Sequence, residues 1–295
     1  MVKAIMTATD PLAKLKAVEI LIKKHPKTPA RESVAREAAH QIDGIKDAAQ
    51  KITLAQQYQA IFKEPSEQQM IMPALIDGLA GANRSDDAFS TGAEFLTHNP
   101  DALLVLVELM SVGTDQAKLK NPKFIPPSLQ YGAHAIELME ADKKPAEIDD
   151  AGWKKFKGTM LPNCYQSMGV LNFVKADHGE AKARLRKAAE LAPADYFNYL
   201  LLSDILDQEY QDAAKQYRSM PDGPARDEEL KKVLASLDQV IDAYAHAIAL
   251  VEGNESLAPV RQQYLHYLEG YYKYRHKNST EGMQQLIDKY KVPAK

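Results

Sequence analysis

The sequence predicts an all-α protein, and three observations carry this prediction. Apolar residues recur at spacings of three and four along almost the whole chain, which is the pattern of amphipathic helices. Few segments alternate with the period of two that a half-buried strand requires. Ala, Leu, Lys, Glu and Gln, which favour helices, dominate the sequence. With 295 residues, 45% of them hydrophobic, the chain can bury a sizeable core.

Charge and cysteine content exclude several classes of partner and site. Lys and Arg number 37 against 40 Asp and Glu, and the net charge is −3, so nucleic acid is not expected as the main partner. Cys164 is the only cysteine, which rules out an internal disulfide and a thiolate metal cluster. No run approaches the roughly 20 apolar residues of a membrane-spanning helix, so no membrane insertion is expected. Residues 1–10 are too short for a secretion signal. The compartment therefore stays open between the cytoplasm and a periplasm reached with a signal peptide since removed.

The first third of the chain divides into helices at cap and turn residues. Pro11 behind Asp10 starts the first helix, and Ser66 with Gln69 forms a capping-box pattern further on. Helices are expected over 11–25, over 30–63 with a break at Gly44, over about 66–80 and over 85–98. Five lysines of the first helix and its turn are expected on a solvated face, with a weakly bound anionic partner as the alternative: Lys14, Lys16, Lys23, Lys24 and Lys27.

The middle of the chain combines a very apolar helix with a long connection. Residues 101–112 are apolar nearly all round, which predicts a helix buried between neighbours. The next stretch, 113–127, exceeds the common connection length and ends in Phe124, Ile125 and two prolines. We interpret it as an insertion, and its Phe124 and Ile125 are candidate partner-binding residues. A hairpin over 128–141 and a short helix around 150–157 are expected to follow.

Residues 162–195 form the most regular unit, a helix, a turn and a second helix. Small residues fall where the two helices must touch, with Gly169 on the first helix and Ala181 and Ala188 on the second. The unit resembles a tetratricopeptide repeat (TPR), whose pattern is an aromatic residue, a small residue one turn on, alanines around a large apolar residue, and then proline. The matching residues are Tyr165, Gly169, Ala181, Leu185, Ala188 and Pro193, and the departures are Asn172 and Gly179.

A second stretch carries the same resemblance. The string AVEILIKKHPKTPARESVAREA, at 17–38, resembles the repeats of bacterial envelope TPR proteins, with His25 in place of an aromatic residue. The matching residues are Ala17, Leu21, Lys23, Lys24, Pro26 and Ala30. The resemblance implies a right-handed α-solenoid of antiparallel helix hairpins, a TPR-like superhelix spanning 1–295. A division into 1–145 and 146–295 is the alternative.

The resemblance also implies a groove lined by the first helix of each hairpin, and a protein or peptide as partner. In the regular unit the groove-facing residues would be Asn163, Gln166, Val170, Phe173 and Val174. Some TPR proteins clamp a partner's terminal carboxylate with Lys and Asn at these places, and Gln166 and Val170 do not supply that clamp. An apolar or mixed groove for an extended segment or a helix is therefore expected.

The last third contains a polar stretch and then an unusually long helix. Residues 208–229 are polar and take the place of a repeat turn. The helix predicted over 226–252 would be about 40 Å long at 1.5 Å per residue. Its apolar residues alternate steps of four and three and form one seam: Leu230, Leu234, Leu237, Ile241, Tyr244, Ile248 and Val251. Self-association through this seam, giving a homo-oligomer, is an alternative function.

A closing hairpin is expected over 257–275 and 279–290, and its first helix carries a row of tyrosines. Tyr264, Tyr267, Tyr271 and Tyr274 share one helix face. Tyrosine is enriched at binding surfaces because it buries a ring while its hydroxyl stays in water. Packing within the closing repeat would explain the same row. Tyr264, Tyr267 and Tyr271 are carried forward as candidate partner-binding residues beside this packing interpretation.

Signatures of catalysis and of cofactor binding are missing from the sequence. The eight histidines never approach metal-ligand spacing, and no Gly-rich phosphate loop occurs. Cys164 lies within a helix, where a role as apolar filler is favoured over a reactive thiolate. We therefore predict a non-enzymatic protein-binding scaffold with no metal site and no cofactor. A helical accessory domain of an envelope enzyme acting on glycans or peptides is the remaining alternative.

Overall fold

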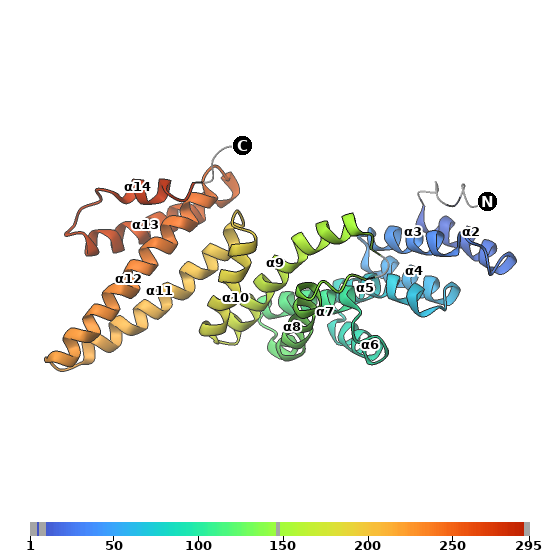
Figure 1. The fold of residues 1–295 in the computed structure, drawn as a ribbon, viewed down its shortest axis with the longest axis horizontal. Helices are drawn as coiled ribbons and strands as arrows, with labels where there is room; N and C mark the ends of the chain where they lie inside the picture. The colour runs from blue at the N-terminus through green and yellow to red at the C-terminus, as the bar shows by residue number, and fades with distance from the viewer. Residues whose placement is uncertain (1–4, 6–9, 146–147, 292–295) are drawn as a thin grey trace. The chain divides into compact units, whose positions relative to one another are not determined.

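The computed structural model describes residues 5, 10–145 and 148–291. Within these residues the protein consists of thirteen α-helices and two short 3-10 helices, without a strand (Figure 1). Successive helices pack as antiparallel pairs, so the predicted all-α fold of helix hairpins is confirmed. The chain divides into two compact units, Met1–Trp153 and Lys154–Lys295, and each is described by itself.

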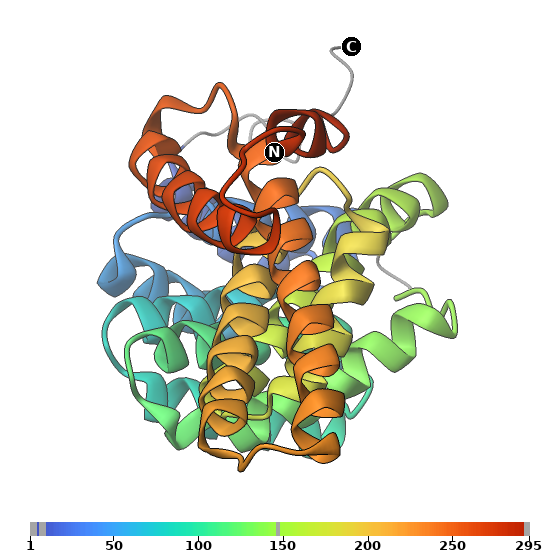
Figure 2. The ribbon, with the colours of Figure 1, turned by 90° about the vertical axis from the view of Figure 1, so that its left-hand side faces the viewer.

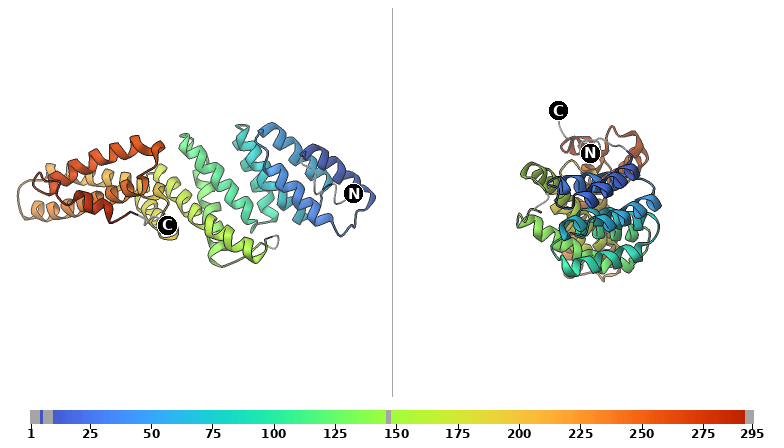
Figure 3. Two further views of the ribbon diagram at one scale, coloured as in Figure 1. Left: turned by 90° about the horizontal axis from the view of Figure 1, so that it is seen from above. Right: turned by 90° about the vertical axis from the view of Figure 1, so that its right-hand side faces the viewer.

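The N-terminal unit stacks seven helices of similar length. They are α2 (Pro11–Lys24), α3 (Arg31–Asp43), α4 (Ala48–Ile61), α5 (Pro65–Gly81), α6 (Ser85–His98), α7 (Leu103–Lys118) and α8 (Ile125–Glu140). Each helix packs on the next one, and α2, α3 and α5 also contact the helix next but one (Figure 3). The stack therefore buries both sides of its inner helices.

Two helix boundaries in this unit test the cap assignments. The break at Gly44 is confirmed, because Gly44 is the C-cap of α3 and Asp47 is the N-cap of the next helix, α4, which begins at Ala48. The capping box predicted at Ser66 and Gln69 is wrong by two residues, because the helix begins earlier in the sequence. The cap is Glu64, followed by Pro65, and the Glu67 carboxylate accepts the backbone N–H of Glu64 at 3.0 Å. An acidic cap ahead of proline carries the same hydrogen bonds as the predicted serine.

The predicted insertion at 113–127 is wrong. Helix α7 continues to Lys118, and a 3-10 turn, η1 (Pro122–Phe124), leads directly into α8. The reason is the close approach of α7 and α8, since a Cβ on Gly113 would lie 1.7 Å from the Ser128 hydroxyl oxygen. Gly113 is therefore a packing residue rather than the start of a loop.

One lysine of the first helix, α2, is buried. Lys14 is only 1% exposed, and its ammonium donates to Glu37 of α3 at 2.7 Å. The prediction of a solvated face is therefore wrong at Lys14. The prediction follows from residue type, because lysine is usually exposed. Pairing with a carboxylate allows Lys14 to be buried at a position that faces the core.

The C-terminal unit is built from longer helices. It contains most of α9 (Asp150–Val174), then α10 (His178–Leu191), α11 (Tyr196–Ser219), α12 (Pro224–Val251), η2 (Glu255–Leu257), α13 (Ala258–Arg275) and α14 (Met283–Asp288). The short helix expected at 150–157 and the helix expected from Pro162 are one continuous helix, α9. In its hairpin with α10, a Cβ on Gly169 would lie 2.6 Å from Leu185 Cγ, which is the close contact that the repeat pattern implied.

The polar stretch at 208–229 is helical over most of its length. Its apolar members Tyr210 and Ala214 are buried against α12, while Asp212 between them is exposed. Only residues 220–223 separate α11 from α12, and Figure 2 shows the two helices side by side. The long helix predicted over 226–252 is therefore present as α12, and the extended polar connection is not.

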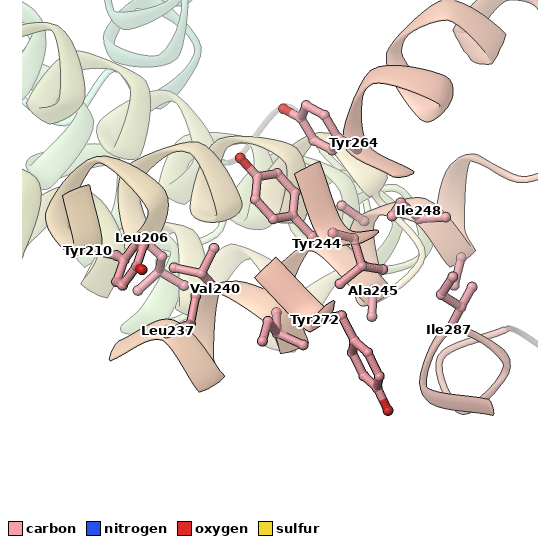
Figure 4. Close-up of a cluster of buried hydrophobic side chains, with 14 of the residues drawn as sticks. Leu206, Tyr210, Leu237, Val240, Tyr244, Ala245, Ile248, Tyr264, Tyr272 and Ile287 are labelled. Atoms are coloured by element: carbon pink, nitrogen blue, oxygen red, sulfur yellow. The ribbon is translucent and has the colours of Figure 1, made fainter. Parts of the chain in front are cut away.

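The apolar seam of α12 lies in the core of this unit. Leu237, Tyr244 and Ile248 are each at most 1% exposed and pack with side chains from α11, α13 and α14 (Figure 4). Leu230 and Leu234, near the start of the helix, stay half-buried. By length and composition α12 is the one helix among the described residues that could cross a membrane, yet half of its most apolar window is buried in the unit. Core helices of packed domains have the same composition, so this is weak evidence for a membrane span.

Candidate functional site: a tyrosine groove in the C-terminal unit

Helices α11, α12 and α13 border a groove in the C-terminal unit. One part has a volume of about 550 Å³ and is lined by Tyr210, Tyr217, Tyr271 and Tyr274, with Leu230 and Val233 of α12. An adjoining part of about 430 Å³ is lined by Asp204, Asp207, Tyr244 and Tyr264. Gln211 and Tyr267 line both parts, so the two hollows adjoin, and the Gln211 amide donates to the Tyr271 hydroxyl at 2.5 Å. We call the whole the tyrosine groove.

Helix periodicity explains why these side chains meet. Asp204, Asp207 and Gln211 follow one another at spacings of three and four on α11, which places them on one face. Tyr264, Tyr267 and Tyr271 do the same on α13. Helix α12 packs between these two helices and contributes Tyr244 from the core.

Hydrogen bonds from tyrosine hydroxyls fix the two carboxylates at one end of the groove. Tyr244 and Tyr271 donate to the two oxygens of Asp207 at 2.7 and 2.6 Å. Tyr264 donates to one oxygen of Asp204 at 2.8 Å. Figure 4 shows the hydroxyl groups of Tyr244 and Tyr264 pointing to the same side, away from Tyr272. The tyrosines thus orient both acids without neutralising them.

The electrostatics of this end follow from burial and from the two like charges. Burial raises the pKa of Tyr244, Tyr264 and Tyr271 above the ordinary value, and the neighbouring aspartates raise it further. The three hydroxyls therefore stay protonated at neutral pH and act as donors. The pKa of Asp204 is raised by partial burial, its hydrogen bond from Tyr264 lowers it, and the Asp207 charge raises it. Desolvation and the neighbouring charge both disfavour the Asp204 carboxylate.

The other end of the groove is open and aromatic. Tyr267 and Tyr274 are 38% and 68% exposed, so their rings are accessible to a partner. A Cβ added to Gly270, which lies between them in sequence, would meet no atom within 4 Å. Arg218 and His266 line this end, which gives the two ends opposite charge character. The groove can therefore receive a ligand that carries both apolar and charged groups.

The sequence-predicted candidates divide into three sets. Tyr264, Tyr267 and Tyr271 come together in the tyrosine groove. Phe124 and Ile125 are each 4% exposed in the N-terminal unit, where the Phe124 ring stacks on Phe89 with centroids 4.4 Å apart. Their side chains fill the core of the α7–α8 hairpin, so they present no surface in this structure.

The candidates on α9 are spread between surface and interior. Asn163 and Val174 are exposed, whereas Val170 is buried. Gln166 donates to Asp195 at 2.7 Å and to Asn198 at 3.1 Å, and Phe173 stacks on His178. Gln166 thus contacts the start of α11, Phe173 contacts α10 and Val170 is buried, and the tyrosine groove lies on other helices.

Sequence reasoning missed Asp204, Asp207 and Tyr244. Tyr244 was assigned to the seam alone, and the two aspartates lie near a stretch interpreted as a connection. The signal that could have found them is the spacing of Asp204, Asp207 and Gln211, because it places three polar residues on one face of a helix.

The N-terminal unit holds its own buried charges but a smaller hollow. Arg31 donates to Glu67 at 2.8 Å, and Lys51 pairs with Asp77. A hollow of about 310 Å³ lies between α2 and α4. Within the described residues of both units, no three His, Cys, Asp or Glu side chains are grouped so that they could hold a metal ion.

Comparison with known proteins gives a similarity of fold. No protein-family model matches the chain, and no curated protein matches it. The fold is similar to a solved structure of the C-terminal part of a TPR repeat-containing protein from Cytophaga hutchinsonii, with a TM-score of 0.46 and 12% sequence identity over 99% of this chain and 98% of that one. In the present chain, sequential antiparallel helix pairs and the Gly169–Leu185 contact make the architecture TPR-like.

Proposed function

We propose that this protein is a non-catalytic scaffold that binds a segment of another protein in the tyrosine groove. The observation that carries the proposal is the open aromatic end of the groove, where Tyr267 and Tyr274 expose their rings. Tyrosine rings at a concave surface supply large contact area at low cost in side-chain entropy, and such residues are enriched where proteins bind one another.

The dimensions of the groove favour an extended segment as its occupant. Asp204 and Arg218 lie fourteen residues apart on one helix, which corresponds to about 21 Å along α11. An extended chain spans about 3.3 Å per residue, so roughly six residues would run between these ends. The opposite charges of the two ends would also give such a segment a preferred direction.

The geometry does not favour a hydrolase that uses the two aspartates. Glycoside hydrolysis needs two carboxyl groups that flank the scissile bond. Asp204 and Asp207 lie on successive turns of the same wall, and both oxygens of Asp207 already accept tyrosine hydroxyls. Self-association through the α12 seam is disfavoured as well, because the seam is occupied within the unit.

A pair of glycine substitutions tests the proposal. Gly270→Leu places an apolar side chain in the open part of the groove, where the structure leaves space. Gly158→Leu is the matched control, because Gly158 is also an exposed helical glycine with no atom within 4 Å of an added Cβ, and it does not line the groove. Both substitutions replace a glycine with a better helix former, so neither is expected to unfold the protein.

The measurement begins with peptides selected on the intact protein from a displayed library of random twelve-residue sequences. Their affinity is then measured by calorimetry on the two variants. Peptides should bind the Gly158→Leu protein as they bind the wild type and lose at least about tenfold in affinity, or 1.4 kcal/mol, on Gly270→Leu. Peptides that bind Gly270→Leu unchanged, or a library that yields no binder, would overturn the proposal.

A further inference from the structure

The acidic end of the tyrosine groove has a negative charge that the described residues do not balance. Asp204 and Asp207 are three residues apart on α11, so their carboxylates lie on adjacent turns. Their hydrogen-bond donors are neutral groups, namely the hydroxyls of Tyr244, Tyr264 and Tyr271 and the side-chain amide of Gln211. Of the described lysines, arginines and histidines, none forms an ion pair with either carboxylate.

The charged groups nearby are engaged elsewhere. Lys182 of α10, which reaches toward α11, pairs with Glu209 at 2.6 Å. On α13, Arg261 pairs with Glu252 and Lys273 with Glu269. Arg218 and His266 line the opposite part of the groove. The repulsion between the two aspartates is therefore left for a ligand to relieve.

Aromatic rings border the same hollow. Tyr264 and Tyr267 line it from α13, and Tyr244 lies beneath with its ring centroid 5.0 Å from that of Tyr264. Aromatic faces attract a cation through the ring quadrupole, and arginine in particular stacks on them while its guanidinium donates to carboxylates. One free oxygen of Asp204 at the edge of the hollow can accept such a donor.

We propose that the hollow lined by Asp204, Asp207, Tyr264 and Tyr267 binds a cationic side chain, arginine or lysine, of the segment held in the groove. This inference rests on the proposed function, because it assigns one residue class of the bound segment. The hollow of about 430 Å³ is large enough for the whole side chain with its stem against Val260. The partner segment should therefore carry a basic residue at the end that lies over Asp204.

The test uses small probes of the cation alone. Nα-acetyl-arginine amide and Nα-acetyl-lysine amide are titrated into the full chain, and the tyrosine ring signals are followed by NMR. Nα-acetyl-citrulline amide, which has nearly the shape of the arginine probe without its charge, is the neutral comparison. A cationic probe should give saturable shifts of Tyr264 and Tyr267 that weaken as salt is added, and the citrulline probe should give none. Equal shifts with citrulline would overturn the inference.

Variants that remove one charge test whether the cationic probe binds at the acidic end of the groove. Asp204→Asn keeps an oxygen that can accept the Tyr264 hydroxyl, so it should fold normally and weaken the cationic probe at least about fivefold. Asp212→Asn removes the same charge from the exposed side of α11 and should change nothing. If the probe bound Asp204→Asn as it binds the wild type, the inference would be overturned. A loss of binding on Asp207→Asn would not rescue the inference, because that substitution also disturbs the two tyrosines that donate to Asp207.

The inference and the proposed function can fail separately. One outcome is that the selected peptides lose affinity on Gly270→Leu and yet carry no basic residue. That result would support the groove as a peptide-binding site and would overturn the inference of a cation site. Conversely, the arginine probe could bind the wild type and not Asp204→Asn while the library yields no peptide. That result would support the cation site and overturn the proposed scaffold function. Gly270→Leu fills only the other part of the groove and should leave the arginine probe bound.

Discussion

The two units use the same helix-hairpin plan with different helix lengths, and the difference decides which of them has a groove. The helices of the N-terminal unit are 13 to 17 residues long, and several contact both the next helix and the one after it. In the C-terminal unit, α11 and α12 have 24 and 28 residues and extend well past the short α10. Their added length leaves part of α11 and α13 facing open space, and the tyrosines lie there.

The two units also hold their charged side chains differently. In the N-terminal unit, charged side chains are neutralised across helices, as in the Lys14–Glu37 and Arg31–Glu67 pairs. In the C-terminal unit, Asp204 and Asp207 are held by neutral hydroxyls. A paired charge completes a core, whereas a charge held only by neutral donors can still bind a cation. The contrast suggests a structural role for the first unit's charges and a binding role for those of the second.

The largest expected effect is overpacking of the N-terminal stack by Gly113→Ala. The new Cβ would meet the Ser128 hydroxyl oxygen at 1.7 Å and the Ser128 Cβ at 2.7 Å, and rotation of the hydroxyl relieves only the first contact. Helices α7 and α8 must separate, so the free energy of unfolding should fall by about 3 kcal/mol. Hydrogen exchange of the full chain should show lost protection in α7 and α8, with α11 to α13 unaffected.

A second substitution serves as the control for that clash. In the Gly113→Ala/Ser128→Gly double variant the added methyl group has space again, so part of the loss should be recovered, less the cost of glycine in helix α8. Unaltered protection of α7 in Gly113→Ala would mean that the two helices are packed more loosely than the structure has them.

An intermediate effect is expected from Glu108, a partly covered acid on α7. Burial, together with the charges of Asp77 and Asp43 and against that of Lys51, raises the pKa of its carboxyl to about 7. Between its ordinary pKa of 4.5 and about 7, the folded protein holds this proton more tightly than the unfolded chain does. The stability contributed by the neutral carboxyl is therefore present below pH 4.5 and is lost as pH rises to about 7.

Glu108→Gln should remove this dependence. At pH 8 the variant should be more stable than the wild type by about 2 kcal/mol, and at pH 4 the two should be equal. The measurement is urea unfolding at both pH values, followed by hydrogen exchange in α7. A difference that stays constant with pH would show that the substitution acts through packing, and that the Glu108 carboxyl titrates near its ordinary pKa.

The sequence was sufficient for the fold class and for local packing because both depend on short-range periodicity. Gly169 and Leu185 belong to one hairpin, sixteen residues apart, and their contact follows from the repeat pattern. The length of α12 followed from its unbroken spacing of apolar residues. Where polar residues are frequent, as over 208–219, composition suggested a connection although Tyr210 and Ala214 keep the helical spacing.

The groove could be predicted only in part because its two walls are far apart in the sequence. The tyrosines of α13 were visible as a row on one helix face, but their partners Asp204 and Asp207 lie sixty or more residues earlier. Which face of α11 meets α13 depends on how α12 packs between them, and a single helix pattern does not contain that information. The burial of Phe124 and Ile125 could not be predicted for the same reason, since it depends on α7 continuing past Gly113.

The smallest expected effect is the opposite of the first and comes from the same chemical change in the other unit. Gly270→Ala adds a methyl group to α13 where no atom lies within 4 Å, so it causes no clash. Alanine loses less conformational freedom than glycine on entering a helix, so the C-terminal unit should gain about 0.5–1 kcal/mol. Hydrogen exchange should slow in α13, and Gly158→Ala in α9 should give a similar gain there. If Gly270→Ala destabilised α13, the space beside it would be filled in solution, and the open end of the tyrosine groove would be closed when no partner is bound.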